Sequence, residues 1–139
     1  MPPDTSCLLC GLQLESHDHL FFACPYSTQL WHRVSMKGDF STPAIPWRQH
    51  IQWLSAHWKG KSLQLRIKLL CLSLSIYHIW RERNRRFHTQ TTTSVPNLFS
   101  LVVEDIRLKL SSYRGIQDTL QHQTIQMGWR LPEYIFSVL

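Results

Sequence analysis

Three cysteines and one histidine near the N-terminus have the residue types and the spacing of a metal site. Cys7, Cys10, His19 and Cys24 follow the pattern C-x2-C-x8-H-x4-C. Four thiolate and imidazole donors complete a tetrahedron around a structural Zn²⁺ ion and leave no position for a substrate. Gly11 follows the first pair and tolerates the positive φ that such a tight turn often needs. The pattern therefore predicts a closed, structural zinc site.

The histidine ligand has one competitor, because His17 lies two residues before His19. The four-residue spacing to Cys24, and the Leu-Phe pair after His19, favour His19. The remaining cysteine, Cys71, lies in an apolar stretch and is expected to be a small buried hydrophobe. A structural zinc contributes about 10–16 kcal/mol to the folding of finger peptides, and this N-terminal segment is too short to build a core without it.

A catalytic constellation is not evident elsewhere in the sequence. The nine acidic residues are scattered, and the only adjacent pair is Glu104 and Asp105, which diverge on a helix. Two-metal chemistry needs clustered carboxylates, and no glycine-rich phosphate loop or nucleophile elbow is present. Thiol catalysis from Cys7 or Cys10 is the alternative, but two further ligands downstream favour zinc. We expect neither an enzyme nor a small-molecule substrate.

The composition is that of a folded, basic protein. The 139 residues are 43% hydrophobic, with six Trp and six Phe, and carry a formal net charge of +6. A basic surface favours polyanions, of which nucleic acid is the commonest, although many small basic domains bind none. The N-terminus has no signal-peptide pattern, and no apolar run is long enough to span a membrane. We expect an intracellular location, in the nucleus or cytoplasm, without secretion or a membrane partner.

Apolar periodicity predicts a mainly α fold, with a small Cys3His zinc knuckle packed on a helical bundle around one long central helix. The expected regions are residues 1–34 for zinc binding, 35–89 for a helical body that includes the long helix 62–89, and 90–139 for C-terminal helices and an apolar tail. Further helices are expected at 27–34, 46–58, 96–115 and, more weakly, 116–127. The tail from Gly128 has no clear pattern, so its docking stays open.

The last turns of the long helix, from Trp80 to His88, are rich in arginine. The periodicity predicts that Trp80, Arg83 or Asn84, and Phe87 face the core. Glu82 and Arg86 read as an ordinary i, i+4 pair worth about a few tenths of a kcal/mol. The arginines have two explanations that the sequence does not separate. They could complement the helix dipole, or they could bind phosphate.

Two motifs resemble a known family. The residues Cys7-Leu-Leu-Cys10-Gly11, Glu15-Ser16, His19-Leu-Phe-x-x-Cys24-Pro25 and Trp31 resemble the zinc-binding region (zf-RVT type) that follows the reverse transcriptase domain in plant LINE-like non-LTR retrotransposon proteins. The later Trp80-Arg-Glu-Arg-Asn-Arg-Arg-Phe87 is similar to a W-x2-R-N-x2-[VIF]-F region of the same proteins. The resemblance implies that His19 is the fourth ligand and that the chain handles nucleic acid. The polymerase domain is absent from this sequence, so we expect a module detached from it.

Two functions from different classes follow. In the first, a zinc-dependent module binds RNA or DNA through backbone contacts, with the candidate phosphate-binding residues Arg81, Arg83, Arg85, Arg86, Lys59 and Lys61. In the second, a zinc-stabilised helical module binds a protein partner through exposed aromatic residues such as Trp47 and Trp58, and its basic charge is incidental.

Overall fold

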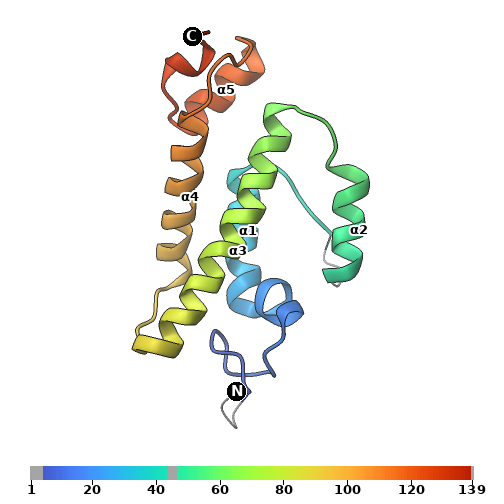
Figure 1. Ribbon diagram of the computed structural model, residues 1–139, viewed down its shortest axis with the longest axis vertical. Coiled ribbons are helices and arrows are strands. Elements are labelled where there is room, and N and C mark those ends of the chain that lie inside the picture. The colour runs from blue at the N-terminus through green and yellow to red at the C-terminus, as the bar shows by residue number, and fades with distance from the viewer. Residues whose placement is uncertain (1–4, 44–46, 139) are drawn as a thin grey trace.

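The computed structural model describes residues 5–43 and 47–138, and these fold into helices around one core (Figure 1). In chain order the elements are η1 (His19–Ala23), α1 (Pro25–Lys37), α2 (Trp47–His57), α3 (Leu63–Thr89), α4 (Val95–Ser111), α5 (Leu120–Gly128) and η2 (Glu133–Phe136). The described residues contain no β-strand, and Ser6 and Leu14 form a single antiparallel bridge. The predicted mainly α fold with one long central helix is confirmed.

The core lies between α1, α3 and α4, which contact one another pairwise, and η1 packs against α1 and α3. Each helix buries one apolar stripe, which is the expected result of a helical period in the sequence. The stripe of α4 is Leu98, Val102, Ile106 and Leu110, and none of its members is more than 1% exposed. On α1 the corresponding residues are Leu30 and Val34, both fully buried. The chain therefore builds a three-helix core, against which the described residues before α1 pack.

Local signals set the starts of these helices. The Ser62 hydroxyl accepts a hydrogen bond from the backbone N–H of Leu65 at 3.1 Å, and the Ser94 hydroxyl accepts one from Asn97 at 3.3 Å. Such side-chain caps satisfy the amide groups that the first turn leaves without partners. Pro25 occupies the first turn of α1, two residues before the predicted start, because proline fits the fixed φ of that position. Pro46 lies outside the described residues.

The C-terminal tail docks on the bundle. Trp129, Leu131 and Ile135 are at most 6% exposed, and the backbone N–H of Ile116 donates to the Ile135 carbonyl at 3.0 Å. Apolar residues without helical period can be buried when a turn and a short 3-10 helix direct them inward, as happens here. Among the described helices, none is long and apolar enough to cross a membrane.

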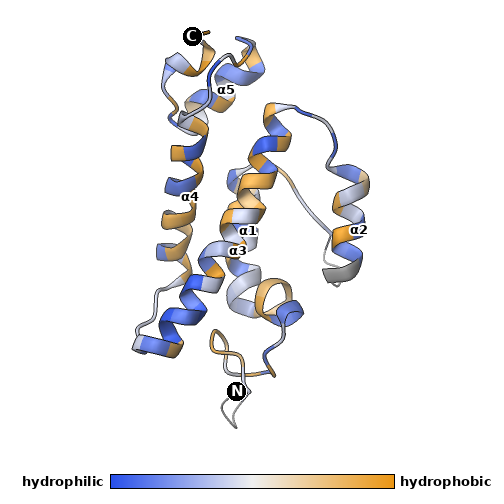
Figure 2. Ribbon diagram, viewed as in Figure 1, coloured by the Kyte–Doolittle hydropathy of each residue, from blue (hydrophilic) through white to orange (hydrophobic). Residues whose placement is uncertain are grey.

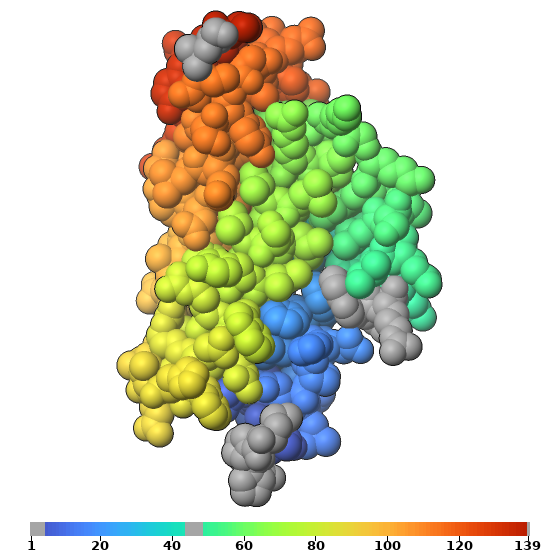
Figure 3. All heavy atoms as spheres, in the orientation of Figure 1, coloured from blue at the N-terminus to red at the C-terminus, as the bar shows by residue number. Residues whose placement is uncertain are grey.

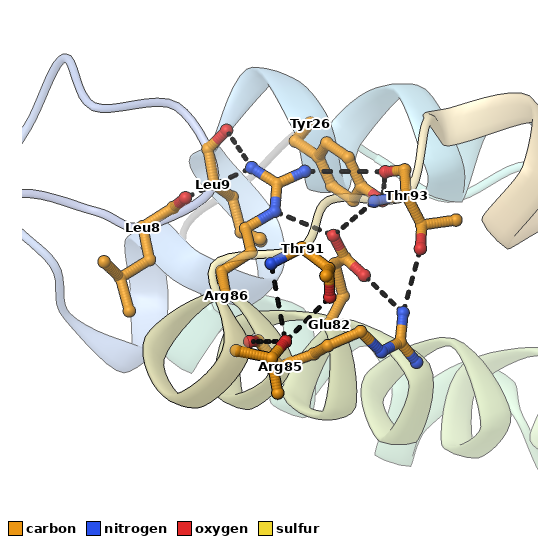
Figure 4. A network of polar contacts seen from close by, with 9 residues as sticks. Leu8, Leu9, Tyr26, Glu82, Arg85, Arg86, Thr91 and Thr93 are labelled. Carbon is orange, nitrogen blue, oxygen red and sulfur yellow. Dashed lines mark hydrogen bonds and ion pairs between the residues drawn. The ribbon is translucent and has the colours of Figure 1, made fainter.

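The final turns of α3 are its most hydrophilic part in Figure 2, yet they contain a fully buried charge. The Glu82 carboxylate is 0% exposed. It accepts hydrogen bonds from Arg85 Nη1 and Arg86 Nε, both at 2.7 Å, and from the backbone N–H of Thr93 at 2.8 Å (Figure 4). A buried carboxylate is costly unless it is paired and hydrogen-bonded, and here three donors satisfy it.

The predicted orientation of these turns is wrong. Trp80 is 44% and Phe87 48% exposed, while Ile79 and Glu82 face the core. Relative to the predicted positions Trp80 and Arg83, the inward face is thus displaced by one residue, which is about 100° on an α-helix with 3.6 residues per turn. On the observed inward face, the Glu82 carboxylate accepts a hydrogen bond from the backbone N–H of Thr93 in the segment that follows α3.

Replacing the buried carboxylate tests this network. The substitution Glu82→Gln keeps the shape but leaves two guanidinium groups without their counter-charge, so the free energy of unfolding should fall by about 3–5 kcal/mol. Urea denaturation with excess zinc measures the change. The matched control is Glu104→Gln, because Glu104 pairs with Arg107 at i, i+3 on the exposed surface of α4 and its loss should have little effect. Equal effects of the two substitutions would contradict a structural role for Glu82.

Candidate metal centre

The four predicted ligands converge at the N-terminal end of the bundle. One donor atom from each of Cys7, Cys10, His19 and Cys24 lies within 4.8 Å of the other three. The Cys7 and Cys24 sulfurs are 3.8 Å apart, and Cys10 Sγ lies 3.3 Å from His19 Nε2. Two sulfurs that share one tetrahedral zinc, each at about 2.3 Å, are about 3.8 Å apart. The donor set and its spacing therefore fit a zinc ion, and the distance between the sulfurs is too long for a disulfide.

The two halves of the site come from different local structures. Cys7 and Cys10 lie on a tight turn in which the N–H of Gly11 donates to the Cys7 carbonyl at 2.8 Å. Gly11 has φ +68°, the left-handed conformation that the sequence predicted for it. The N–H of Leu12 points to Cys10 Sγ at 3.5 Å, a contact that favours a thiolate. This turn alone brings two sulfurs to one point.

The other two ligands lie at the two ends of a single helical turn. His19 opens η1, and its backbone N–H donates to the Ser16 hydroxyl at 3.1 Å. Cys24 follows η1 and is at the same time the N-cap of α1. His17, the competing ligand, is exposed and outside the cluster. The structure therefore brings His19, and not His17, together with the three cysteines.

The thiols differ in acidity when no metal is bound. Burial raises the pKa of the Cys24 thiol to about 12, although backbone N–H groups of Ser27 and Tyr26 act in the opposite direction. For Cys10, burial also acts to raise the pKa, but hydrogen bonds from Leu12, His19 and Cys24 lower it to about 6. One thiolate therefore forms easily, while a second in the same small space is opposed by burial and by charge repulsion. A bound cation would remove that opposition.

The zinc region is held on α3 by the network around Glu82. Arg86 Nη1 donates to the carbonyl oxygens of both Leu8 and Leu9, each at 3.1 Å, and these residues lie between the first two ligands (Figure 4). Arg83 forms an ion pair with Glu15 at 2.9 Å, just beyond the same turn. The guanidinium of Arg86 also lies 4.8 Å from the Tyr26 ring, where a cation–π contact adds to the packing. This structural role of Glu82 and its arginines was not predicted, because an i, i+4 pair in a sequence carries no sign of its burial.

The six candidate phosphate-binding residues do not form one patch. Arg83, Arg85 and Arg86 are partly buried and paired with Glu15 or Glu82. Arg81, Lys59 and Lys61 are exposed. The two lysines precede α3, and 20 residues separate Lys61 from Arg81, which is about 30 Å along a helix. The six residues are therefore not placed to contact phosphates together.

Comparison with known proteins supports the zinc assignment. Residues 1–31 match a family described as zinc-binding in reverse transcriptase (zf-RVT). The match covers 31 of the 139 residues. No curated protein and no solved structure matches the chain.

Removing one ligand should release the metal. We expect about one zinc per chain in the native protein, and much less in Cys7→Ala, because a three-ligand site loses affinity and its thiolates lose their counter-charge. Metal analysis after dialysis measures the content, and amide hydrogen exchange of residues 7–24 reports the local unfolding. Cys71→Ala is the matched control, since Cys71 is equally buried but lies outside the cluster. A Cys7→Ala protein that retains a full zinc would refute the assignment.

Zinc affinity should fall as the pH falls. The Cys24 thiol is protonated at neutral pH in the metal-free protein, because its pKa is raised to about 12, and zinc must displace that proton. Below about pH 6, Cys10 also takes up a proton, so the affinity should fall more steeply there. Competition with a chelating dye at several pH values measures this dependence. An affinity that does not change with pH would contradict thiolate ligation.

Proposed function

We propose that the protein is a zinc-stabilised, nucleic-acid-binding module of the reverse transcriptase type, which binds RNA or DNA through phosphate contacts. The match of residues 1–31 to a zinc-binding region of reverse transcriptases carries the proposal, because those enzymes act on nucleic acid. The module supplies binding without catalysis, and a closed zinc site suits that role, since four protein ligands leave no open coordination position. Three zinc thiolates also favour a reducing compartment, the nucleus or the cytoplasm.

The distribution of charge supports an anionic partner. The net charge is +6, and several acids are neutralised within the fold. Glu82 pairs with Arg85 and Arg86, and Glu15 pairs with Arg83. Lys59, Lys61 and Arg81 are exposed and have no carboxylate partner among the described residues. We propose that Arg81, Lys59 and Lys61 contact phosphates, while Arg83, Arg85 and Arg86 primarily hold the zinc region in place.

A protein partner is the second candidate, and one surface favours it. The N-terminal half of α3 borders an apolar hollow of about 410 Å³ that includes Leu69, Ile76 and Tyr113. Leu69 is 49% exposed, and aliphatic surfaces of this kind commonly mark protein contacts. Trp58 is a weaker candidate than the sequence indicates, because it is half-buried and packs edge-on against Phe40. The Trp47 side chain lies outside the described part of the chain.

A salt titration tests the main proposal. The zinc-loaded protein should bind labelled single-stranded RNA or duplex DNA with an affinity that falls as salt rises, with a logarithmic slope of about −0.7 or −0.9 per phosphate contact, respectively. Arg81→Gln, and separately Lys59→Gln with Lys61→Gln, should each reduce the slope by about one per lost contact. Arg114→Gln is the control, since Arg114 is exposed but lies beyond α4. Absence of binding to every nucleic acid at low salt would refute the proposal.

A further inference from the structure

Aromatic rings are exposed along the C-terminal half of α3. Tyr77 is 48% exposed, Trp80 44% and Phe87 48%. Residues three, seven and ten positions apart on a helix lie near one face, so these rings form a row. Figure 3 shows the surface of α3 crossing the visible face of the molecule, with its C-terminal end at the lower left beside the N-terminal residues. Half-exposed rings grouped in this way are uncommon on a surface that binds nothing.

Guanidinium groups lie against the same rings. Arg81 Cζ is 5.5 Å from the centre of the Tyr77 ring, and Arg83 Cζ is 5.7 Å from Trp80 and 5.5 Å from Phe87. Glu15 neutralises Arg83. Arg81 has only a 3.5 Å contact to the Tyr77 hydroxyl and no carboxylate within the described residues. The face thus offers planar rings together with one uncompensated positive charge.

A hollow adjoins the middle ring of the row. Its volume is about 400 Å³, and Trp80 and Leu20 line it together with Arg83 and residues 15–17. It lies where the zinc region meets α3, and its lining is mostly apolar. Cavities that hold whole small ligands begin at about 300 Å³, so a single planar base can enter beside the indole.

We propose that this face binds unpaired nucleobases, and that the nucleic acid of the proposed function is therefore single-stranded at this place. One base stacks on Trp80 in the hollow, neighbouring bases lie on Tyr77 and Phe87, and Arg81 contacts a phosphate between them. Stacking of bases on aromatic side chains, combined with cationic contacts to the backbone, is how proteins hold single strands. The bases of a duplex are already stacked on one another and cannot offer their faces to these rings. This inference rests on the proposed function and adds the form of the strand.

Substitutions of exposed aromatic residues, on α3 and at the other end of the molecule, test this proposal. Binding of labelled single-stranded RNA, single-stranded DNA and a hairpin duplex to the zinc-loaded full chain is measured by fluorescence anisotropy. Trp80→Leu should weaken single-strand binding by about 5- to 150-fold, the range expected for one stacked base, and should leave duplex binding within about twofold. Trp80→Tyr retains a ring and should restore most of the affinity. Zinc content verifies that each variant is folded.

The matched control comes from the other end of the molecule. Tyr134 is 46% exposed, and Arg114 lies over its ring at 3.8 Å, so it resembles the Tyr77–Arg81 pair but belongs to η2. Tyr77→Leu should weaken single-strand binding, and Tyr134→Leu should not. A preference for duplex, or equal affinities of native and Trp80→Leu protein for single strands, would overturn this inference while the proposed function stands. Equal effects on RNA and DNA would support stacking alone, and a loss confined to RNA would support stacking that also depends on the ribose hydroxyl.

Discussion

The buried carboxylate of Glu82 is the interaction on which the arrangement of the zinc region and the helices depends. A charge at 0% exposure is tolerated only when its hydrogen-bond partners are complete, and Arg85, Arg86 and the Thr93 amide complete them. Arg86 is then fixed in position and binds the carbonyl groups of Leu8 and Leu9. The same contacts determine which side of α3 faces the core and which side exposes Trp80 and Phe87.

The zinc site could be predicted from the sequence because all of its ligands lie in one short segment. All four ligands lie between Cys7 and Cys24, and a tetrahedral ion constrains both their types and their spacing. The helices were also predictable, because apolar residues that recur with a period of 3.6 can be recognised without knowing which element the helix packs against. The ends of the helices were less predictable. Pro25 was predicted to end the preceding turn, with the helix starting at Ser27, whereas in the structure Pro25 belongs to the first turn of α1.

The role of the arginines could not be predicted, because it depends on residues distant in sequence. Glu82 and Arg86 are four apart, and such a pair looks the same in a sequence whether it lies in solvent or in the core. Burial is decided by the chain that returns at Thr93 and by the turn at Leu8, and neither belongs to the helix. Aromatic residues mislead for the same reason, since Trp80 has the apolar character of a core residue but lies on the outer face.

Cys24 is both the last of the four candidate zinc ligands and the N-cap of α1. In tandem zinc fingers, each finger is a separate folding unit that can be moved or exchanged, because each metal ion stabilises only its own finger. Here the ligand belongs to the first turn of a helix that supplies Leu30 and Val34 to the bundle core. The knuckle and the bundle therefore share a residue, so that moving the knuckle to another scaffold would also require the helix that begins at its last cysteine.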